Sequence, residues 1–94
     1  MKDEKKVIVL HPRDNVATAL TAIEVGTTIH VAVRGAINKL EVKNPIPFGH
    51  KVALVPVRKG EVIRKYGEPI GKAKQDIEEG NHVHTHNVKS MRQR

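Results

Sequence analysis

One short pattern recurs along this chain and limits how the chain can fold. Each copy has an apolar residue three positions before a glycine and another apolar residue three positions after it. We interpret three copies here: residues 23–29, 57–63 and 77–83, centred on Gly26, Gly60 and Gly80. Glycine adopts the positive φ that tight turns need, so we interpret each copy as a corner between two strands. The copies are unequally spaced and therefore do not form a solenoid repeat.

The residues available for a core are almost all aliphatic. The chain has 94 residues, with one Phe, one Tyr and no Trp, so its core must come from Val, Ile, Leu and Ala. The β-branched members of this set favour strands over helices. A chain of this length forms one small domain and is short for an enzyme with a deep pocket of its own.

Alternating apolar and polar residues between turn signals indicate several strands. We expect strands within residues 6–11, 27–35, 38–43, 51–57, 61–66 and 68–74. Residues 15–23 fit either a short helix capped by Asp14 or an extended segment, and we favour the strand. Residues 44–50 contain two prolines and a glycine and are expected to form a shaped loop. No long helix is expected, so the predicted fold class is mainly β.

Composition also excludes several classes of protein. The chain has no cysteine, which rules out disulfides, thiolate zinc sites and a cysteine nucleophile. No apolar run approaches the roughly 20 residues that span a bilayer, and the start "MKDEKK" lacks the apolar stretch of a signal peptide. We therefore expect a cytoplasmic protein with no membrane segment.

The net charge of +7 favours an anionic partner, although part of the excess lies in the terminal "VKSMRQR". Nucleic acid, a carboxylate-bearing metabolite and an acidic protein surface all fit this charge. Nucleic acid ranks last, because the chain lacks aromatic stacking residues and mixes acidic residues among its basic ones.

The string "GNHVHTHN" places three histidines at alternate positions: His82, His84 and His86. On a strand, alternate side chains share a face, with neighbours roughly 6.6 Å apart and the outer pair roughly 13 Å apart. A single ion is then better held by one adjacent pair, with further ligands from elsewhere in the fold or from a partner. A metal site, a catalytic site and a solvated strand all remain open at this point.

Three other histidines lie outside this string. His11 ends the first expected strand, His30 lies inside a strand and is expected to be structural, and His50 follows the proline-rich loop. The glycine before His50 lets backbone approach a ligand, and Lys51 follows directly. His50 is thus the strongest functional candidate of the three.

Four strings, in one order from about His11 to Asn87, carry a family resemblance: "HPRDNVATAL", "PIPFGHKVAL", "KYGEPIGKA" and "GNHVHTHN". They resemble the N-terminal domain of the altronate and galactarate dehydratases, and equally the separate small subunit of related lyases such as sulfolactate sulfo-lyase. The resemblance implies an SAF domain with the β-clip fold, made of short twisted strands with little helix. We expect an N-terminal strand and lead-in at 1–10, the SAF domain at 11–88 and a basic tail at 89–94.

The resemblance also implies lyase chemistry on a polyhydroxy acid such as altronate or galactarate. A base removes the proton α to a carboxylate, a divalent cation stabilises the developing enediolate, and an acid protonates the departing hydroxyl. In the sulfo-lyase branch the leaving group is sulfite. The chain is then a small subunit, inactive alone, that shares an active site and a divalent metal with a large subunit. Iron and manganese are the metals expected first.

Carried over by motif, the resemblance implies a set of site residues. The catalytic candidates are His50, His84 and His86, and the metal ligands are His84 and His86. The substrate-binding candidates are His11, Asp14, Asn15, Lys51, Lys65, Tyr66, Gly67 and Asn87. Structural roles stay open for three of these, because Asp14 can cap a turn, Tyr66 can pack in the core and Gly67 can permit a bend.

Two alternatives remain beside the dehydratase subunit. The chain can be a sulfolactate sulfo-lyase small subunit, or a free-standing β-clip module that binds a sugar acid or carbohydrate without metal. An isolated β protein of this kind can also cover exposed strand edges by forming a homodimer.

Overall fold

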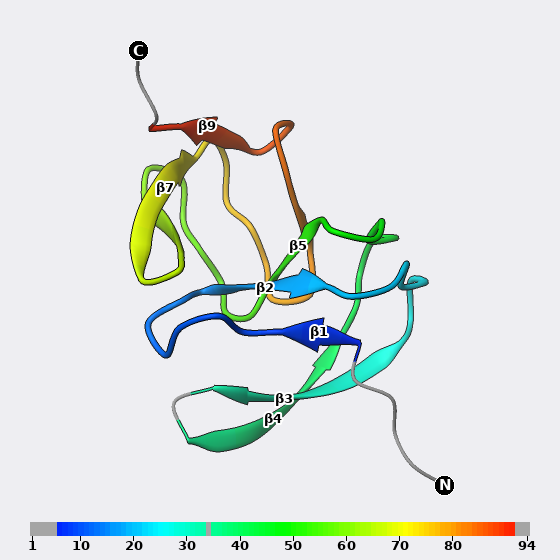
Figure 1. Cartoon of the computed structure of the whole chain (residues 1–94). Helices are drawn as coiled ribbons and strands as arrows, with labels where there is room; N and C mark the ends of the chain where they lie inside the picture. The colour runs from blue at the N-terminus through cyan, green and yellow to red at the C-terminus, as the bar shows by residue number, and fades with distance from the viewer. Residues whose placement is uncertain (1–5, 34, 92–94) are drawn as a thin grey trace, which may run out of the picture.

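The computed structural model describes residues 6–33 and 35–91 (Figure 1). Residues 1–5 of the predicted lead-in and 92–94 of the predicted tail lie outside this range. The described residues contain no helix and form these strands: β1 (Val7–Ile8), β2 (Val16–Ala19), β3 (Thr28–Val33), β4 (Ala36–Glu41), β5 (Lys51–Ala53), β6 (Val62–Lys65), β7 (Glu68–Ala73), β8 (His82–Val83) and β9 (Val88–Ser90). The expected mainly β class is confirmed.

The strands make three small antiparallel sheets (Figure 1). The largest has the order β1-β2-β5-β8, the second is the β3–β4 hairpin, and the third has the order β6-β7-β9. The ambiguous segment 15–23 contains β2, so it is extended as favoured. Since the described residues form no helix, none of them makes a helix that could cross a membrane.

The three predicted corners share one hydrogen-bond pattern. At the corner of Gly60, φ is +89°, the Gly60 amide donates to the Ala73 carbonyl at 2.8 Å, and the Ala73 amide donates back to the Glu61 carbonyl at 2.9 Å. Gly26 and Gly80 have φ of +89° and +88° and make the same pair of bonds with Val42 and Ala53. The corner hypothesis is therefore confirmed at all three glycines.

A fourth corner lies in the segment that the sequence indicated only as a shaped loop. Ile46, Gly49 and Val52 have the same spacing, and Gly49 has a φ of +83°. Its amide donates to the Ala19 carbonyl at 2.9 Å, and the Ala19 amide returns a bond to the His50 carbonyl at 2.8 Å. His50 therefore directly follows a corner glycine, in a backbone position fixed by these two bonds.

The four corners pair two by two, which gives the chain two halves of similar plan. Ile23 bridges to Ile46 with the β3–β4 hairpin between them, and Val57 bridges to Ile77 with the β6–β7 hairpin between them. The apolar corner residues of the first half pack in one core cluster: Ile23, Ile29, Ile46 and Val52. Those of the second half pack in another: Val57, Ile63, Ile77 and Val83.

Several strands are shorter than expected. The sequence predicts one core strand over 51–57, but β5 ends at Ala53 and the chain bends at Leu54 and Val55. The reason is that Val57 already begins the third corner, so the strand has to end before it. At the C-terminal end, β9 runs to Ser90 and the Met91 amide bonds to the Ile70 carbonyl at 3.1 Å. The first residues of the predicted tail thus join the third sheet.

The corners provide a matched test of backbone packing. A Cβ at Gly60 would meet nothing within 4 Å, whereas one at Gly80 would collide with the Glu41 carbonyl oxygen, at nearly the same φ. We expect Gly60→Ala to lower the free energy of unfolding by about 1–2 kcal/mol through φ strain alone. Gly80→Ala should cost roughly 1–3 kcal/mol more, because Glu41 has to move. Urea denaturation of both variants measures the difference, and equal losses would contradict the close approach.

Candidate metal centre

The pairing of β5 with β8 brings distant histidines to one face. Lys51 pairs with Val83, and Val52 pairs with His82. The same register, carried one pair further, sets His50 opposite His84. Directly opposite side chains in an antiparallel pair point the same way, with Cβ atoms roughly 4.5–5.5 Å apart. Alternation then puts His82 on this face as well.

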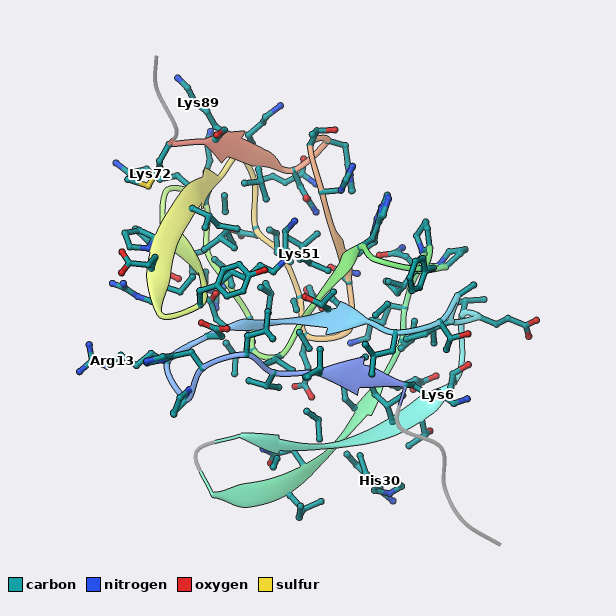
Figure 2. The ribbon with its side chains drawn as sticks, viewed as in Figure 1. Lys6, Arg13, His30, Lys51, Lys72 and Lys89 are labelled. Atoms are coloured by element: carbon teal, nitrogen blue, oxygen red, sulfur yellow. The ribbon has the colours of Figure 1, made fainter. Side chains whose placement is uncertain are left out.

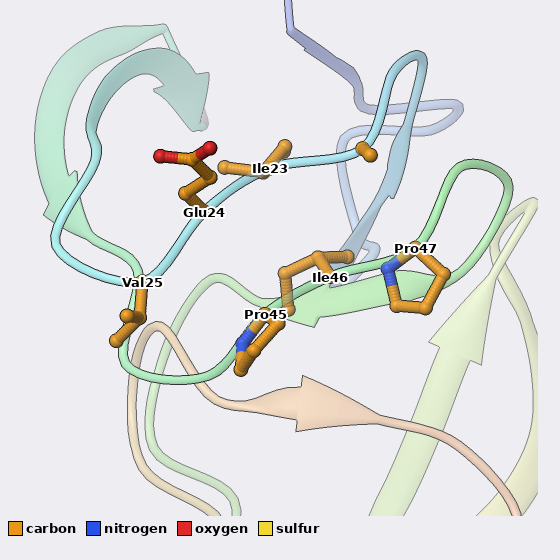
Figure 3. A pocket seen from close by; sticks show the side chains of 7 residues that line it. Ile23, Glu24, Val25, Pro45, Ile46 and Pro47 are labelled. Carbon is orange, nitrogen blue, oxygen red and sulfur yellow. The ribbon is translucent and has the colours of Figure 1, made fainter.

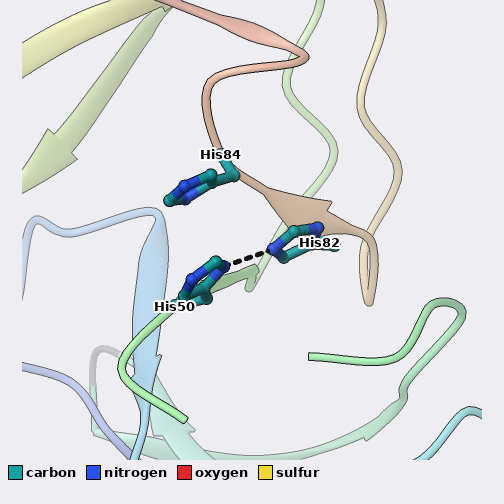
Figure 4. Close-up of side chains that lie close together, drawn as sticks. All are labelled: His50, His82 and His84. Atoms are coloured by element: carbon teal, nitrogen blue, oxygen red, sulfur yellow. Dashed lines mark hydrogen bonds between the residues drawn. The ribbon is translucent and has the colours of Figure 1, made fainter. Parts of the chain in front are cut away.

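Three imidazoles form one compact group, which we call the histidine triad: His50, His82 and His84 (Figure 4). His50 Nδ1 lies 2.8 Å from His82 Nε2, at hydrogen-bonding distance. The ring centroids of His50 and His84 are 4.0 Å apart with an interplanar angle of 11°. One ligand nitrogen from each residue lies within 4.8 Å of the other two.

His86 lies beside the triad rather than in it. After β8 the chain turns, and the Asn87 amide donates to the His84 carbonyl at 3.0 Å. This turn ends the extended spacing assumed from the sequence and places the His86 ring on His82, with centroids 5.2 Å apart. His86 is exposed. Its predicted roles as ligand and catalytic residue stay predictions, while His82 takes a place in the triad that spacing alone did not indicate.

The triad fits a divalent metal ion in both geometry and ligand chemistry. Two nitrogens bonded to one ion at about 2.1 Å lie roughly 3–3.4 Å apart. The observed separations of 2.8 Å and up to 4.8 Å lie on either side of that value. Because the three rings are stacked nearly parallel, they have to turn before their lone pairs point at one ion. Imidazole suits iron, copper, nickel and zinc, and the triad alone does not select among metals.

The electrostatic surroundings keep two of the imidazoles neutral. Partial burial is the largest cause that lowers the pKa of His82, to about 4, followed by the nearby His86, His50, His84 and Lys51. Desolvation, then His50, Lys51 and His86 also lower the pKa of His84. At neutral pH both rings therefore have a free lone pair, which metal ligation requires.

Lys51 provides positive charge next to the triad, because it is among the causes that lower the pKa of His82 and His84. Burial lowers the pKa of Lys51, and the second cause is the ammonium group of Lys65, so the two groups lie near each other. Lys65 Nζ also lies 5.2 Å from the centre of the exposed Tyr66 ring. In Figure 2 Lys51 lies centrally, whereas Arg13, Lys72 and Lys89 lie at the periphery. Lys51 and Lys65 can together attract a carboxylate.

The "HPRDN" residues fasten the β6–β7 hairpin. Asp14 is buried, and its carboxylate oxygens accept from the Tyr66 amide at 3.0 Å and the Gly67 amide at 2.8 Å. Asn15 accepts from the Arg64 amide and donates to the Val62 carbonyl. These bonds give both residues a structural role, and substrate contact by either stays a prediction.

His11 and the turn after β6 pack together. Tyr66 and Gly67 both have positive φ, of 64° and 75°. A Cβ on Gly67 would lie 2.8 Å from His11 Nε2, so a larger residue here would require the His11 ring to move. The Arg13 amide donates to His11 Nδ1 at 3.1 Å, which fixes the orientation of the imidazole. Tyr66 is 62% exposed and is therefore not a core residue.

Asn44, which the sequence did not single out, contacts the site with its side chain, which bonds to the backbone of His82. Its Oδ1 accepts from the His82 amide at 2.9 Å and from Asn81 Nδ2 at 3.0 Å. An asparagine before a proline indicates a turn and no more. Asn87, which the family motif does indicate, is buried and bonds to the backbones of His82 and His84.

Comparison with known proteins identifies the family to which this domain belongs. Residues 5–91 match the family described as the altronate/galactarate dehydratase SAF domain. The chain belongs to this family, and the resemblance deduced from its four strings is confirmed.

Individual relatives fall into two groups. The chain is 44% identical over 86 residues to altronate dehydratase of Bacillus subtilis (strain 168), which is 92% of this chain and 16% of that enzyme. It is 40% identical over 83 residues to altronate dehydratase of Escherichia coli (strain K12), again 16% of that enzyme's length. It is 52% identical over 54 residues to (2R)-sulfolactate sulfo-lyase subunit alpha of Paracoccus pantotrophus, 57% of this chain and 81% of that subunit. The chain thus spans less than a fifth of either altronate dehydratase.

Metal titration tests the triad. We expect Co(II) to bind the metal-free chain, and His82→Ala or His84→Ala to weaken binding by more than about tenfold, since changes around a ligand alone cost that much. His30→Ala, at an exposed histidine on β3, is the control and should leave binding unchanged. Calorimetry and Co(II) absorption measure the affinities. A larger loss from His86→Ala than from His82→Ala would replace the triad by the pair chosen from sequence.

Proposed function

We propose that the chain is the small subunit of a metal-dependent lyase that dehydrates sugar acids of the altronate and galactarate type. The observation that carries the proposal is the triad of His50, His82 and His84 with Lys51 beside it and Lys65 near Lys51. These groups contribute to an active site shared with a large subunit. The family and its relatives support lyase chemistry of this class.

The proposed reaction is an elimination. A base takes the proton α to the carboxylate, the electron pair forms the new double bond, and the β-hydroxyl leaves as water after protonation. A bound divalent ion would supply positive charge where negative charge develops on the substrate. The lysines hold the carboxylate, and His86, which lies beside the triad and is not one of its three ligands, transfers protons. His82, with its pKa near 4, is a weak base at neutral pH and suits ligation better.

Two observations support a large-subunit partner. The similar sulfo-lyase chain is named as a subunit alpha, so that protein is one part of an assembly. An apolar hollow also lies on the proline loop, lined by Ala22, Ile23, Glu24, Val25, Pro45, Ile46 and Pro47 (Figure 3). Phe48 comes directly after Pro47, the last residue that lines the hollow. It is 71% exposed and lies two residues before His50 in the sequence. A partner seated on this surface would contact the segment that leads to His50.

A second candidate function is that of a sulfolactate sulfo-lyase small subunit, with sulfite as the leaving group. The identity to subunit alpha, 52% over 81% of its length, favours this candidate specifically. The same residues would act, because both reactions begin with loss of a proton α to a carboxylate. Only the leaving group and its contacts differ.

Reconstitution tests the proposed function. We expect the chain, co-expressed with the protein encoded beside it, to form a complex that holds metal and dehydrates altronate or galactarate. The chain alone should dehydrate neither acid. His84→Ala in the complex should remove most of the activity. Sulfite release from sulfolactate, with no dehydration, would select the second candidate. Binding of a sugar acid by the chain alone, without metal or partner, would show a free-standing binding module instead.

The partner surface has its own prediction. Phe48→Ser should weaken the complex by about 2 kcal/mol or more, the loss expected when an exposed aromatic anchors an interface. Ile37→Ser is the matched control, because Ile37 is also 71% exposed but lies on the β3–β4 hairpin. Calorimetric titration of the two subunits measures both affinities. A larger loss from Ile37→Ser would move the interface to the hairpin.

A further inference from the structure

Asn87 joins the backbones of two triad residues. The His84 amide donates to Asn87 Oδ1 at 2.9 Å, and Asn87 Nδ2 donates to the His82 carbonyl at 2.8 Å. A backbone amide only donates and a carbonyl only accepts, so the orientation of the side-chain amide is fixed. Asn87 is 3% exposed, so neither bond has water as a ready replacement. One buried side chain thus ties β8, which carries His82, to the turn that begins at His84.

Asn44 holds His82 from the opposite side. Its Oδ1 accepts both the His82 amide and Asn81 Nδ2. Asn44 also begins the loop that leads to His50, six residues further on. The bond therefore links the segment that carries His50 with the segment that carries His82. In these contacts Asn44 acts only as an acceptor, whereas Asn87 is both donor and acceptor.

We propose that Asn87 and Asn44 are positioning residues that set the spacing of the triad imidazoles for metal binding, without contacting the metal. This inference rests on the proposed metal-dependent function. Asn87 fixes His82 relative to His84, and Asn44 fixes His82 relative to the His50 loop. Groups that orient ligands control metal affinity strongly, with losses of about 10–100-fold when they are removed.

The different bonding of the two residues makes aspartate a discriminating substitution. Asn44→Asp keeps an acceptor for both N–H donors, so the triad geometry survives. Asn87→Asp keeps the bond from the His84 amide but sets a carboxylate oxygen against the His82 carbonyl, where a donor is needed. Both variants add one negative charge near the same histidines. Any general attraction of the metal to that charge is therefore common to the two.

The test combines Co(II) titration with ring-nitrogen NMR of the metal-free chain. We expect Asn44→Asp to bind Co(II) within about threefold of the unaltered chain and to keep its absorption spectrum. Asn44→Ala, Asn87→Ala and Asn87→Asp should lose about tenfold in affinity and change the spectrum. Without metal, the nitrogen shifts that report the His50–His82 contact should persist in Asn44→Asp and change in the other three.

The outcomes separate this inference from the proposed function. If the unaltered chain binds no Co(II), the metal proposal fails, and the nitrogen shifts alone then decide whether the asparagines position the rings. If Asn87→Asp keeps both the affinity and the shifts, or Asn44→Asp loses them as Asn44→Ala does, the positioning role is wrong. Circular dichroism identifies any Asn87 variant that does not fold, and the comparison of Asn44→Asp with Asn44→Ala then decides whether the asparagines position the rings.

Discussion

The site depends on the antiparallel contact between β5 and the corner that leads into β8. The Gly80 amide donates to the Ala53 carbonyl at 2.9 Å, and the Ala53 amide donates to the Asn81 carbonyl at 3.0 Å. These two bonds fix the register in which Val52 faces His82. A shift of one residue would send every side chain to the other face, and the imidazoles would separate. The close approach of Gly80 to Glu41 leaves this corner no room for a side chain.

The triad lies where the two similar halves of the chain meet. His50 follows the second corner of the first half, and His82 follows the second corner of the second half. His50 and Asn81 therefore occupy equivalent places, each directly after a corner glycine. Each half has two corners with a hairpin between them. The residues that differ between equivalent places in the two halves form the site. The Asn81 side chain donates to Asn44 Oδ1 and is not part of the triad. At this equivalent place the second half therefore supplies structural support, whereas the first half supplies the imidazole of His50.

Local sequence patterns predicted much of the architecture, whereas the grouping of the histidines depends on how distant segments pair. Corner glycines and strand alternation are local patterns, so Gly26, Gly60 and Gly80 could be assigned without any structure. The fourth corner was missed because Pro45 and Pro47 make the segment resemble an irregular loop, although its spacing is the same. The partnership of His50 with His82 depends on a register between residues about 30 apart, which no local pattern encodes. The turn held by Asn87 likewise ends the straight-strand spacing assumed for His82, His84 and His86, whereas the choice of His84 and His86 as ligands came from the family motif.

Charge explains why such a site needs an anionic substrate or partner. The triad consists of three histidines, and an imidazole brings no negative charge to a divalent ion. Because the pKa of His82 and of His84 is lowered, these two rings are neutral at pH 7. Lys51 and Lys65 add further positive charge nearby. A bound dication would thus keep its full charge in a cationic neighbourhood, which favours coordination by a carboxylate from outside the triad. In the proposed reaction a sugar acid would supply that carboxylate and offset the charge that the protein leaves uncompensated. The same imbalance would hold metal weakly in the chain alone and more tightly once a substrate or an acidic partner surface closes the site.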